Sequence, residues 1–410
     1  MNMSETDRSP VGEPVSKRRR GTGTVRRAAG AGAMLAALVL FSQTPAAEAL
    51  PPGALSWHYS ERAAVRGITV GPIESVLHPG HGYGSEDCAK AVREARRMGA
   101  NWVSFTPFGR VWNAAPTGVA LDFEAPFSAN RSAVVRAIRQ AHAEGLKVLL
   151  IPQLWVETGV WRGHIDPADD QGWQRWARGY RAFILEWAQV AAETEADMFS
   201  VGVELRSWVT SDRAPSFIEI TRDVRRVYPG LVTFAANWDD VDDTIILGEL
   251  DVIGVNAFYP LAEEPSADLP RLMQGGREAA RQVEKLAQTW DKPVLFTEFG
   301  YTTRSDPALR PWEWPEHLSN VEVDPAAQAR AYHALLAAFL DRPWFVGFFV
   351  WRMYADPDDV SQEPEWGFSP RGKPAELVLR DAFHAFMAAD GVRPPGTSLA
   401  RHAAQRWGVY

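Results

Sequence analysis

The 410-residue chain has a single cysteine, Cys88, so it can form no intramolecular disulfide framework and no cysteine-rich zinc site. Its nine histidines include no His-x-x-x-His pair of the kind that holds zinc. It also lacks an excess of basic residues, since 43 Lys and Arg face 51 Asp and Glu, which argues against a nucleic-acid partner. We therefore expect no metal and no nucleic acid, and we expect Cys88, in helix-like surroundings, to be a buried structural thiol.

The N-terminus has an apolar run, residues 28–41, whose 14 residues are too few to span a bilayer as a helix; that takes ~20. Basic residues precede this run, and the small-x-small sequence Ala47-Glu48-Ala49 follows it. The pattern predicts a signal peptide over residues 1–49 and a secreted protein that begins near Leu50. Arg26-Arg27 leaves twin-arginine export open beside the Sec route, and an uncleaved membrane anchor is the other alternative.

Short apolar runs alternate with amphipathic helical stretches over residues 50–410, and no Gly/Ser-rich or Pro-rich linker divides them. Runs of this length, rich in Val, Ile and Phe, are typical of strands buried on both faces. The eight runs are residues 67–70, 102–107, 148–154, 198–205, 231–237, 252–259, 294–299 and 346–351. They predict a single (β/α)₈ TIM barrel domain. A doubly wound open sheet gives a similar alternation, but the Gly-rich loop of dinucleotide-binding sheets is missing after the first run.

Glutamates stand at the ends of two of these runs, where a barrel carries its chemistry. Glu204 lies at the end of the fourth run and Glu298 at the end of the seventh, on opposite sides of the expected barrel mouth. Amide and aromatic side chains stand at the other run ends, namely Gln153, Trp155, Asn237, Trp238, Asn256, Tyr259 and Trp351. Planar rings can contact the C–H face of a sugar and amides can bind its hydroxyls, so the pattern predicts a sugar-binding site.

Two facing carboxyl groups can together break a glycosidic bond. One, kept protonated, delivers a proton to the leaving oxygen, and the other, ionised, stabilises or attacks the positively charged anomeric centre. At a separation of ~5–5.5 Å the second group forms a covalent intermediate, and configuration is retained. We therefore predict that Glu204 and Glu298 form the catalytic pair, against the alternative that each only makes an ion pair at a strand end. The nearby acidic residues Asp239, Asp240, Asp242 and Asp243 are expected to be solvated rather than to hold a metal.

From about Arg66 to Lys373 the sequence resembles glycoside hydrolase family 113, barrel enzymes that act on β-1,4-mannan within a clan of retaining glycosidases. The resemblance rests on separated motifs in the right order, at residues 161–165, 202–205, 237–238, 251–261, 297–301 and 369–374. It implies that Glu204 is the general acid/base and Glu298 the nucleophile. It also implies that Tyr259 donates a hydrogen bond to the nucleophile and that Trp351 floors the subsite of the attacked sugar. No cofactor is implied.

The sequence departs from the family pattern at two places. The third run ends Ile151-Pro152-Gln153-Leu154-Trp155, where the family has Lys-Pro-His-Val-Asp. Val203 stands where the family tends to have Thr and where many clan members have the Asn that binds the sugar 2-hydroxyl. Because lost hydroxyl partners change selectivity strongly, both differences are expected to alter which sugar is held.

The sequence thus predicts a secreted, monomeric, retaining glycoside hydrolase of β-linked oligo- or polysaccharides, with β-1,4-mannan or manno-oligosaccharides as the candidate substrate. A catalytically silent carbohydrate-binding protein and a transglycosidase are the alternatives; retention of both glutamates argues against the first. Further tryptophans are candidates for outer subsites, namely Trp112, Trp208, Trp312 and Trp314.

Overall fold

The computed structural model describes residues 50–58, 60, 62–71, 80–313, 321–356, 358 and 366–389. The predicted signal segment and Trp314 lie outside these residues. Across the ranges that are described, no helix has both the length and the apolar character of a membrane span.

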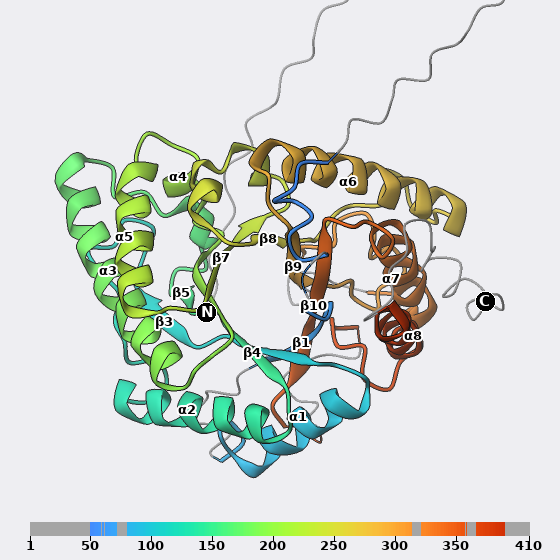
Figure 1. Ribbon diagram of the computed structural model, residues 1–410, viewed down its shortest axis with the longest axis horizontal. Helices are drawn as coiled ribbons and strands as arrows, with labels where there is room; N and C mark the ends of the chain where they lie inside the picture. Colours follow the sequence, from blue (N-terminus) through green and yellow to red (C-terminus); the bar gives the residue numbers. More distant parts are fainter. Residues whose placement is uncertain are drawn as a thin grey trace, which may run out of the picture. The chain divides into compact units, whose positions relative to one another are not determined.

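Eight parallel strands close into a barrel, and helices surround it (Figure 1). The strands are β1 (Val65–Gly71), β2 (Trp102–Phe105), β4 (Lys147–Leu150), β6 (Met198–Val203), β7 (Leu231–Asn237), β8 (Ile253–Asn256), β9 (Val294–Phe299) and β10 (Phe345–Tyr354). Each predicted run contributes one of them, and β1 pairs with both β2 and β10, so the sheet has no edge. The (β/α)₈ prediction is confirmed, and the open sheet is excluded.

The helices cover the outside of the barrel. They are α1 (Glu86–Arg97), α2 (Phe127–Ala143), α3 (Asp170–Glu193), α4 (Arg206–Val209), α5 (Ala214–Val227), α6 (Leu269–Trp290), α7 (Pro325–Phe339) and α8 (Pro374–Ala389), with short 3₁₀ turns η1 (Arg162–His164), η2 (Val241–Asp243) and η3 (Ile245–Glu249). Ser85, Asp169, Asp268 and Asp324 cap the N-termini of α1, α3, α6 and α7 by accepting backbone N–H bonds. Each such cap contributes about 1 kcal/mol.

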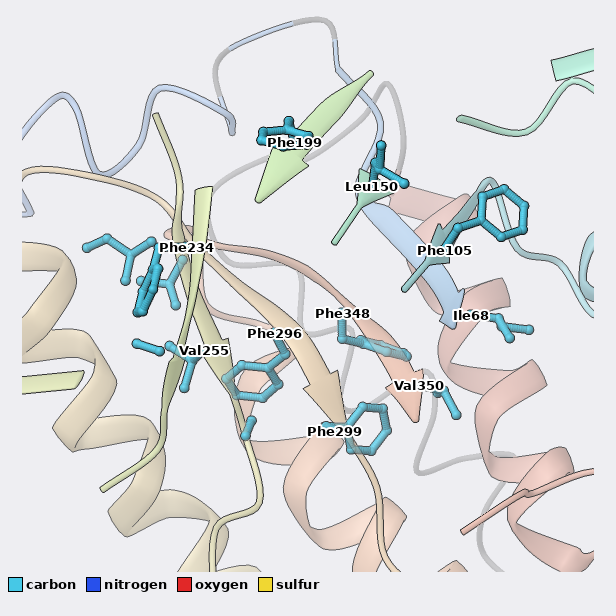
Figure 2. Close-up of a cluster of buried hydrophobic side chains, with 14 of the residues drawn as sticks. Ile68, Phe105, Leu150, Phe199, Phe234, Val255, Phe296, Phe299, Phe348 and Val350 are labelled. Atoms are coloured by element: carbon cyan, nitrogen blue, oxygen red, sulfur yellow. The ribbon is translucent and has the colours of Figure 1, made fainter. Parts of the chain in front are cut away.

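Alternation along the strands divides the core into two layers. Neighbouring strand residues point to opposite faces, so Leu149 lies inside the barrel while Leu150 packs outward among the helices. Figure 2 shows the outer layer, which includes Leu150, Phe199 and Phe296. Cys88 of α1 belongs to this outer layer and is fully buried, as predicted, and burial raises the pKa of its thiol to about 11.

The predicted third strand is divided in two, because Pro152 has no N–H with which to continue the ladder. Beyond it, β5 (Gln153–Val156) leaves the barrel and pairs with β3 (Phe108–Val111) in a separate two-stranded sheet. Phe108 is opposite Gln153 in this pair, and Arg110 is opposite Trp155. The extension carries Gln153 to the rim of the barrel.

The contact between β1 and β10 depends on Gly347, whose φ is +133° and whose added Cβ would lie 2.0 Å from the Val65 carbonyl oxygen. Gly145, after α2, also has a positive φ, of +74°, but a Cβ there would meet nothing within 4 Å. We expect Gly145→Ala to cost about 1–2 kcal/mol, the price of the left-handed conformation alone. Gly347→Ala adds a backbone clash and should lower the melting temperature at least twice as far. Calorimetry of both variants checks this, and equal shifts would show that β1 and β10 can separate without loss.

Candidate active site

A cavity of about 470 Å³ lies at the carboxyl ends of the barrel strands, a size typical of small-ligand sites. Both predicted glutamates line it. The other lining residues are Gln153, Trp161, Arg162, His164, Arg206, Asn237, Trp238, Asp239, Phe258, Trp312, Trp351 and Phe368. The walls therefore combine aromatic rings with amides and charged groups, and the charges are of both signs.

Glu204 follows the last residue of β6 and has a φ of +51°. A left-handed conformation is uncommon for a residue other than glycine and costs of order 1 kcal/mol, and such strain clusters at functional sites. Two donors hold the carboxylate, the indole Nε1 of Trp161 at 2.8 Å and the amide Nδ2 of Asn256 at 2.9 Å. The hydroxyl of Thr297 donates to Asn256 Oδ1 at 2.9 Å, which fixes the orientation of that amide.

Glu298, on β9, lines the cavity and is 5% exposed. Gln153 Nε2 donates to Glu298 Oε1 at 2.9 Å, and Arg162 donates to Gln153 Oε1 at 2.8 Å. Burial raises the pKa of Glu298 to about 8, and the charge of Glu204 adds to the rise, whereas Arg162, Arg352 and the Gln153 hydrogen bond oppose it. Near neutral pH burial therefore favours the protonated form of Glu298.

Arg206 links the cavity wall to the acidic residues after β7. It donates to Asp240 at 2.7 Å and also to Asp239, and Asp239 in turn accepts from Asn237 Nδ2 at 2.6 Å. Its guanidinium lies 4.7 Å from the ring centre of Trp161, the residue that donates to Glu204. Asp240 was expected to be solvated, but it is buried behind Arg206, and burial raises its pKa to about 6.

Aromatic side chains form the rest of the wall. Phe258, Trp351 and Phe368 make one buried cluster, with Trp238 packed against it. Trp238 stacks on Trp312, with ring centres 5.3 Å apart and planes inclined by 25°. These faces are suited to stacking on the C–H faces of sugar rings. The structure thus places Gln153, Asn237, Trp238, Trp351 and both glutamates in one cavity.

Three residues expected to bind substrate lie elsewhere, and two of them are the last residue of β8 and a residue just after it. Asn256 is fully buried and uses its amide for Glu204 and Thr297, so it supports Glu204 and does not line the cavity. Tyr259 was expected to donate to Glu298. Instead its ring packs between Trp238 and Phe296, and its buried hydroxyl has no partner among the described residues. Because β8 ends at Asn256, strand alternation no longer sets these directions, and Phe258 lines the cavity.

Trp155 is the third residue that was expected to bind substrate but lies outside the cavity. It is 50% exposed on β5 and packs against Phe108 and Phe123 instead of lining the cavity. Two residues along a strand cover roughly 6.6 Å, so Trp155 stands beyond Gln153, outside the rim. Trp208 is also no subsite residue, since it is buried among the aromatic side chains of α3 and α5. Trp112 is 64% exposed and outside the cavity.

Sequence reasoning missed the roles of Trp161, Arg162, His164 and Arg206. The first three lie at η1, in the loop after β5, and all four line the cavity. For the first three, the signal in the sequence is the family-like motif at residues 161–165, whereas Arg206 lies outside every motif.

Comparison with known proteins identifies the family. The family model named Glycoside Hydrolase Family 113 matches residues 77–369, more than two thirds of the chain. The family 113 β-mannanase AaManA from Alicyclobacillus acidocaldarius, solved in complex with ManMIm, is 27% identical, with a TM-score of 0.68 over 79% of this chain and 98% of that one. A second family 113 structure, a β-1,4-mannanase complex, is 25% identical, with a TM-score of 0.67 over 79% of this chain and 99% of the other.

More distant structures share the fold alone. A family 5 mannosidase from Rhizomucor miehei is 13% identical, with a TM-score of 0.56 over 81% of this chain and 95% of the other. A search of curated proteins gave no match. The match over most of the chain establishes that this protein belongs to glycoside hydrolase family 113, a family of retaining barrel glycosidases.

Proposed function

We propose that the protein hydrolyses a β-linked glycan by double displacement, with Glu204 as acid/base and Glu298 as nucleophile. The observation that carries this proposal is that two carboxyl groups from opposite sides of the barrel share one cavity with stacking aromatic faces. In the first step Glu298 attacks the anomeric carbon, and the bond to the leaving oxygen breaks as that oxygen takes the proton of Glu204. In the second, Glu204 removes a proton from water, the water oxygen bonds to the anomeric carbon, and Glu298 leaves as a carboxylate.

The proton has to change places when substrate binds. Glu204 accepts hydrogen bonds from Trp161 and Asn256, while burial favours the neutral form of Glu298. The anomeric carbon develops positive charge in the transition state, and this charge favours an ionised Glu298. The glycosidic oxygen then gives Glu204 an acceptor for the proton. A proton that passes from Glu298 to Glu204 stays within the cavity, so this step requires no net uptake.

β-1,4-Mannan and manno-oligosaccharides are the substrates we propose, supported by the two family 113 structures, both of β-mannanases. Product release from mannans and from β-linked gluco-, xylo- and manno-oligosaccharides tests this. Cleavage of manno-substrates supports the proposal. Cleavage of only the gluco- or xylo-oligosaccharides would show that the substrate is another β-linked glycan. Binding without cleavage would favour the silent carbohydrate-binding alternative.

We propose export for residues 1–49, supported by the basic residues, the 14-residue apolar run and the Ala47-Glu48-Ala49 sequence. N-terminal sequencing of protein from the culture medium tests this, and a mature end near Leu50 is expected.

Removing each carboxyl in turn tests the assigned roles. Glu298→Ala should lower turnover at least roughly a thousand-fold, because the covalent route is lost. With azide and a 2,4-dinitrophenyl β-glycoside, this variant should form an α-glycosyl azide, since azide attacks the face that Glu298 occupied. Glu204→Ala should form the β-azide, through the covalent intermediate. NMR of the anomeric proton distinguishes the two products. The exposed Glu263→Ala serves as the control, and native turnover in Glu298→Ala would refute the assignment.

The buried nucleophile should also destabilise the fold as pH rises. The pKa of Glu298 rises from 4.5 to about 8 on folding, so its contribution to stability is complete below pH 4.5 and is lost as pH rises through 8. Glu298→Gln cannot ionise. Its melting temperature should match the native value near pH 4.5 and exceed it by several degrees at pH 9. Calorimetry across this range checks the sign, and Glu263→Gln should show no such trend. A difference that shrinks with rising pH would contradict the burial argument.

A further inference from the structure

We infer that Gln153, anchored by Arg162, is the positioning residue of the nucleophile and supplies the hydrogen bond expected from Tyr259. The inference rests on the proposed function, in which Glu298 attacks the anomeric carbon. It concerns a position where this chain departs from the family pattern, since Gln153 stands in place of a histidine.

The contacts of Gln153 leave its amide only one orientation. Arg162 has donors and no acceptor, so the group that faces it must be Oε1 of Gln153, at 2.8 Å. Nε2 is thereby directed to Glu298 Oε1, at 2.9 Å, as a donor. Gln153 is 2% exposed, so water does not compete freely for either contact. The arrangement is a chain of two hydrogen bonds that starts at a fixed positive charge.

Within the part of the chain that the structure describes, other groups near Glu298 do not take this role. Asn256 is committed to Glu204 and Thr297. Phe258, on the cavity wall, has no hydroxyl, and the hydroxyl of Tyr259 is buried and makes no hydrogen bond to Glu298. Among the described residues, Gln153 alone donates a hydrogen bond to Glu298, and it does so to Oε1. Oε2 is thus left for the anomeric carbon.

Arg162 acts on the nucleophile through this amide. Without Arg162, no donor holds the carbonyl oxygen of Gln153, and the amide is free to turn this oxygen toward Glu298 in place of Nε2. Glu298 would then lose the donated hydrogen bond, and the turned amide would favour the protonated carboxyl over the carboxylate that attacks. Loss of Arg162 should therefore matter much more when Gln153 is present than when it is absent. A purely steric role for Gln153 predicts no such coupling.

The test is covalent trapping by 2,4-dinitrophenyl 2-deoxy-2-fluoro-β-mannobioside and the matching cellobioside, followed by intact mass from pH 4 to 10. Glu298 attacks the anomeric carbon, and the bond to oxygen breaks as dinitrophenolate leaves with the electron pair. Because this leaving group needs no proton, the trapping rate reports on attack by Glu298 and does not require proton donation by Glu204.

Gln153→Ala should slow trapping roughly ten- to hundred-fold, as expected for a lost hydrogen bond to a charged group, and should shift the pH of half-maximal rate upward. Gln153→Glu keeps the size but removes the donor, and it should be slowed at least as far. Arg162→Met should slow trapping in the native background and change it less than twofold beside Gln153→Ala. Gln140→Ala, which removes a glutamine bonded to backbone carbonyls outside the cavity, should behave as native.

Native trapping rates and pH dependence in Gln153→Ala and Gln153→Glu would overturn the positioning role and leave the proposed function standing. A native protein that neither reagent labels would instead overturn the proposed function, and this inference with it. Equal effects of Arg162→Met in both backgrounds would show that Arg162 acts independently of Gln153.

Discussion

Two carboxyl groups that share one cavity repel each other when both are ionised, and the surroundings of Glu204 and Glu298 are organised by that repulsion. Each carboxyl has its own donors: Trp161 and Asn256 bind Glu204, whereas Gln153 binds Glu298. The deeper one, Glu298, keeps a raised pKa in spite of the positive charges near it. Two similar groups are thereby made unequal, but the proton rests on the group that has to attack, so the proposed reaction needs substrate to shift it to Glu204.

The closed barrel keeps the surroundings of Glu204 and Glu298 different. Glu204 extends β6 and Glu298 belongs to β9, and both strands are hydrogen-bonded on each side, so neither carboxyl can relieve the repulsion by moving its backbone. Supporting groups come from other strands: Asn256 from β8 and Gln153 from β5, at the rim above β4. The strained backbone of Glu204 persists because the surrounding structure determines it. Strain and burial at the mouth are tolerated because the two-layered apolar core below offsets them.

The strands and both glutamates could be predicted because they depend on local pattern: buried parallel strands are continuously apolar, and chemistry follows their carboxyl ends. The errors begin where strands stop. Tyr259 and Phe258 are adjacent after β8, and sequence cannot tell which of two aromatic rings turns toward the cavity once alternation has ended. Trp155 was placed correctly on a strand, but Pro152 had moved that strand beyond the barrel. Trp161 and Arg162 depend on the course of a long loop, for which no residue pattern is diagnostic.

The altered end of the third strand has a consequence for how the sugar is held. Ile151 and Val203 face the barrel interior with the core, so neither offers a polar group to a hydroxyl. Gln153 is used by Glu298 and Arg162, and Asn237 is bound to Asp239. Many polar side chains of the cavity are therefore hydrogen-bonded to the two glutamates or to one another. The rings of Trp238, Trp312 and Trp351 remain available to stack on the substrate. Stacking recognises the shape of a ring, whereas hydrogen bonds distinguish the configuration of single hydroxyls. We therefore expect this cavity to select strictly for β-linked sugar chains. We expect it to discriminate less between sugars that differ only in the configuration of one hydroxyl.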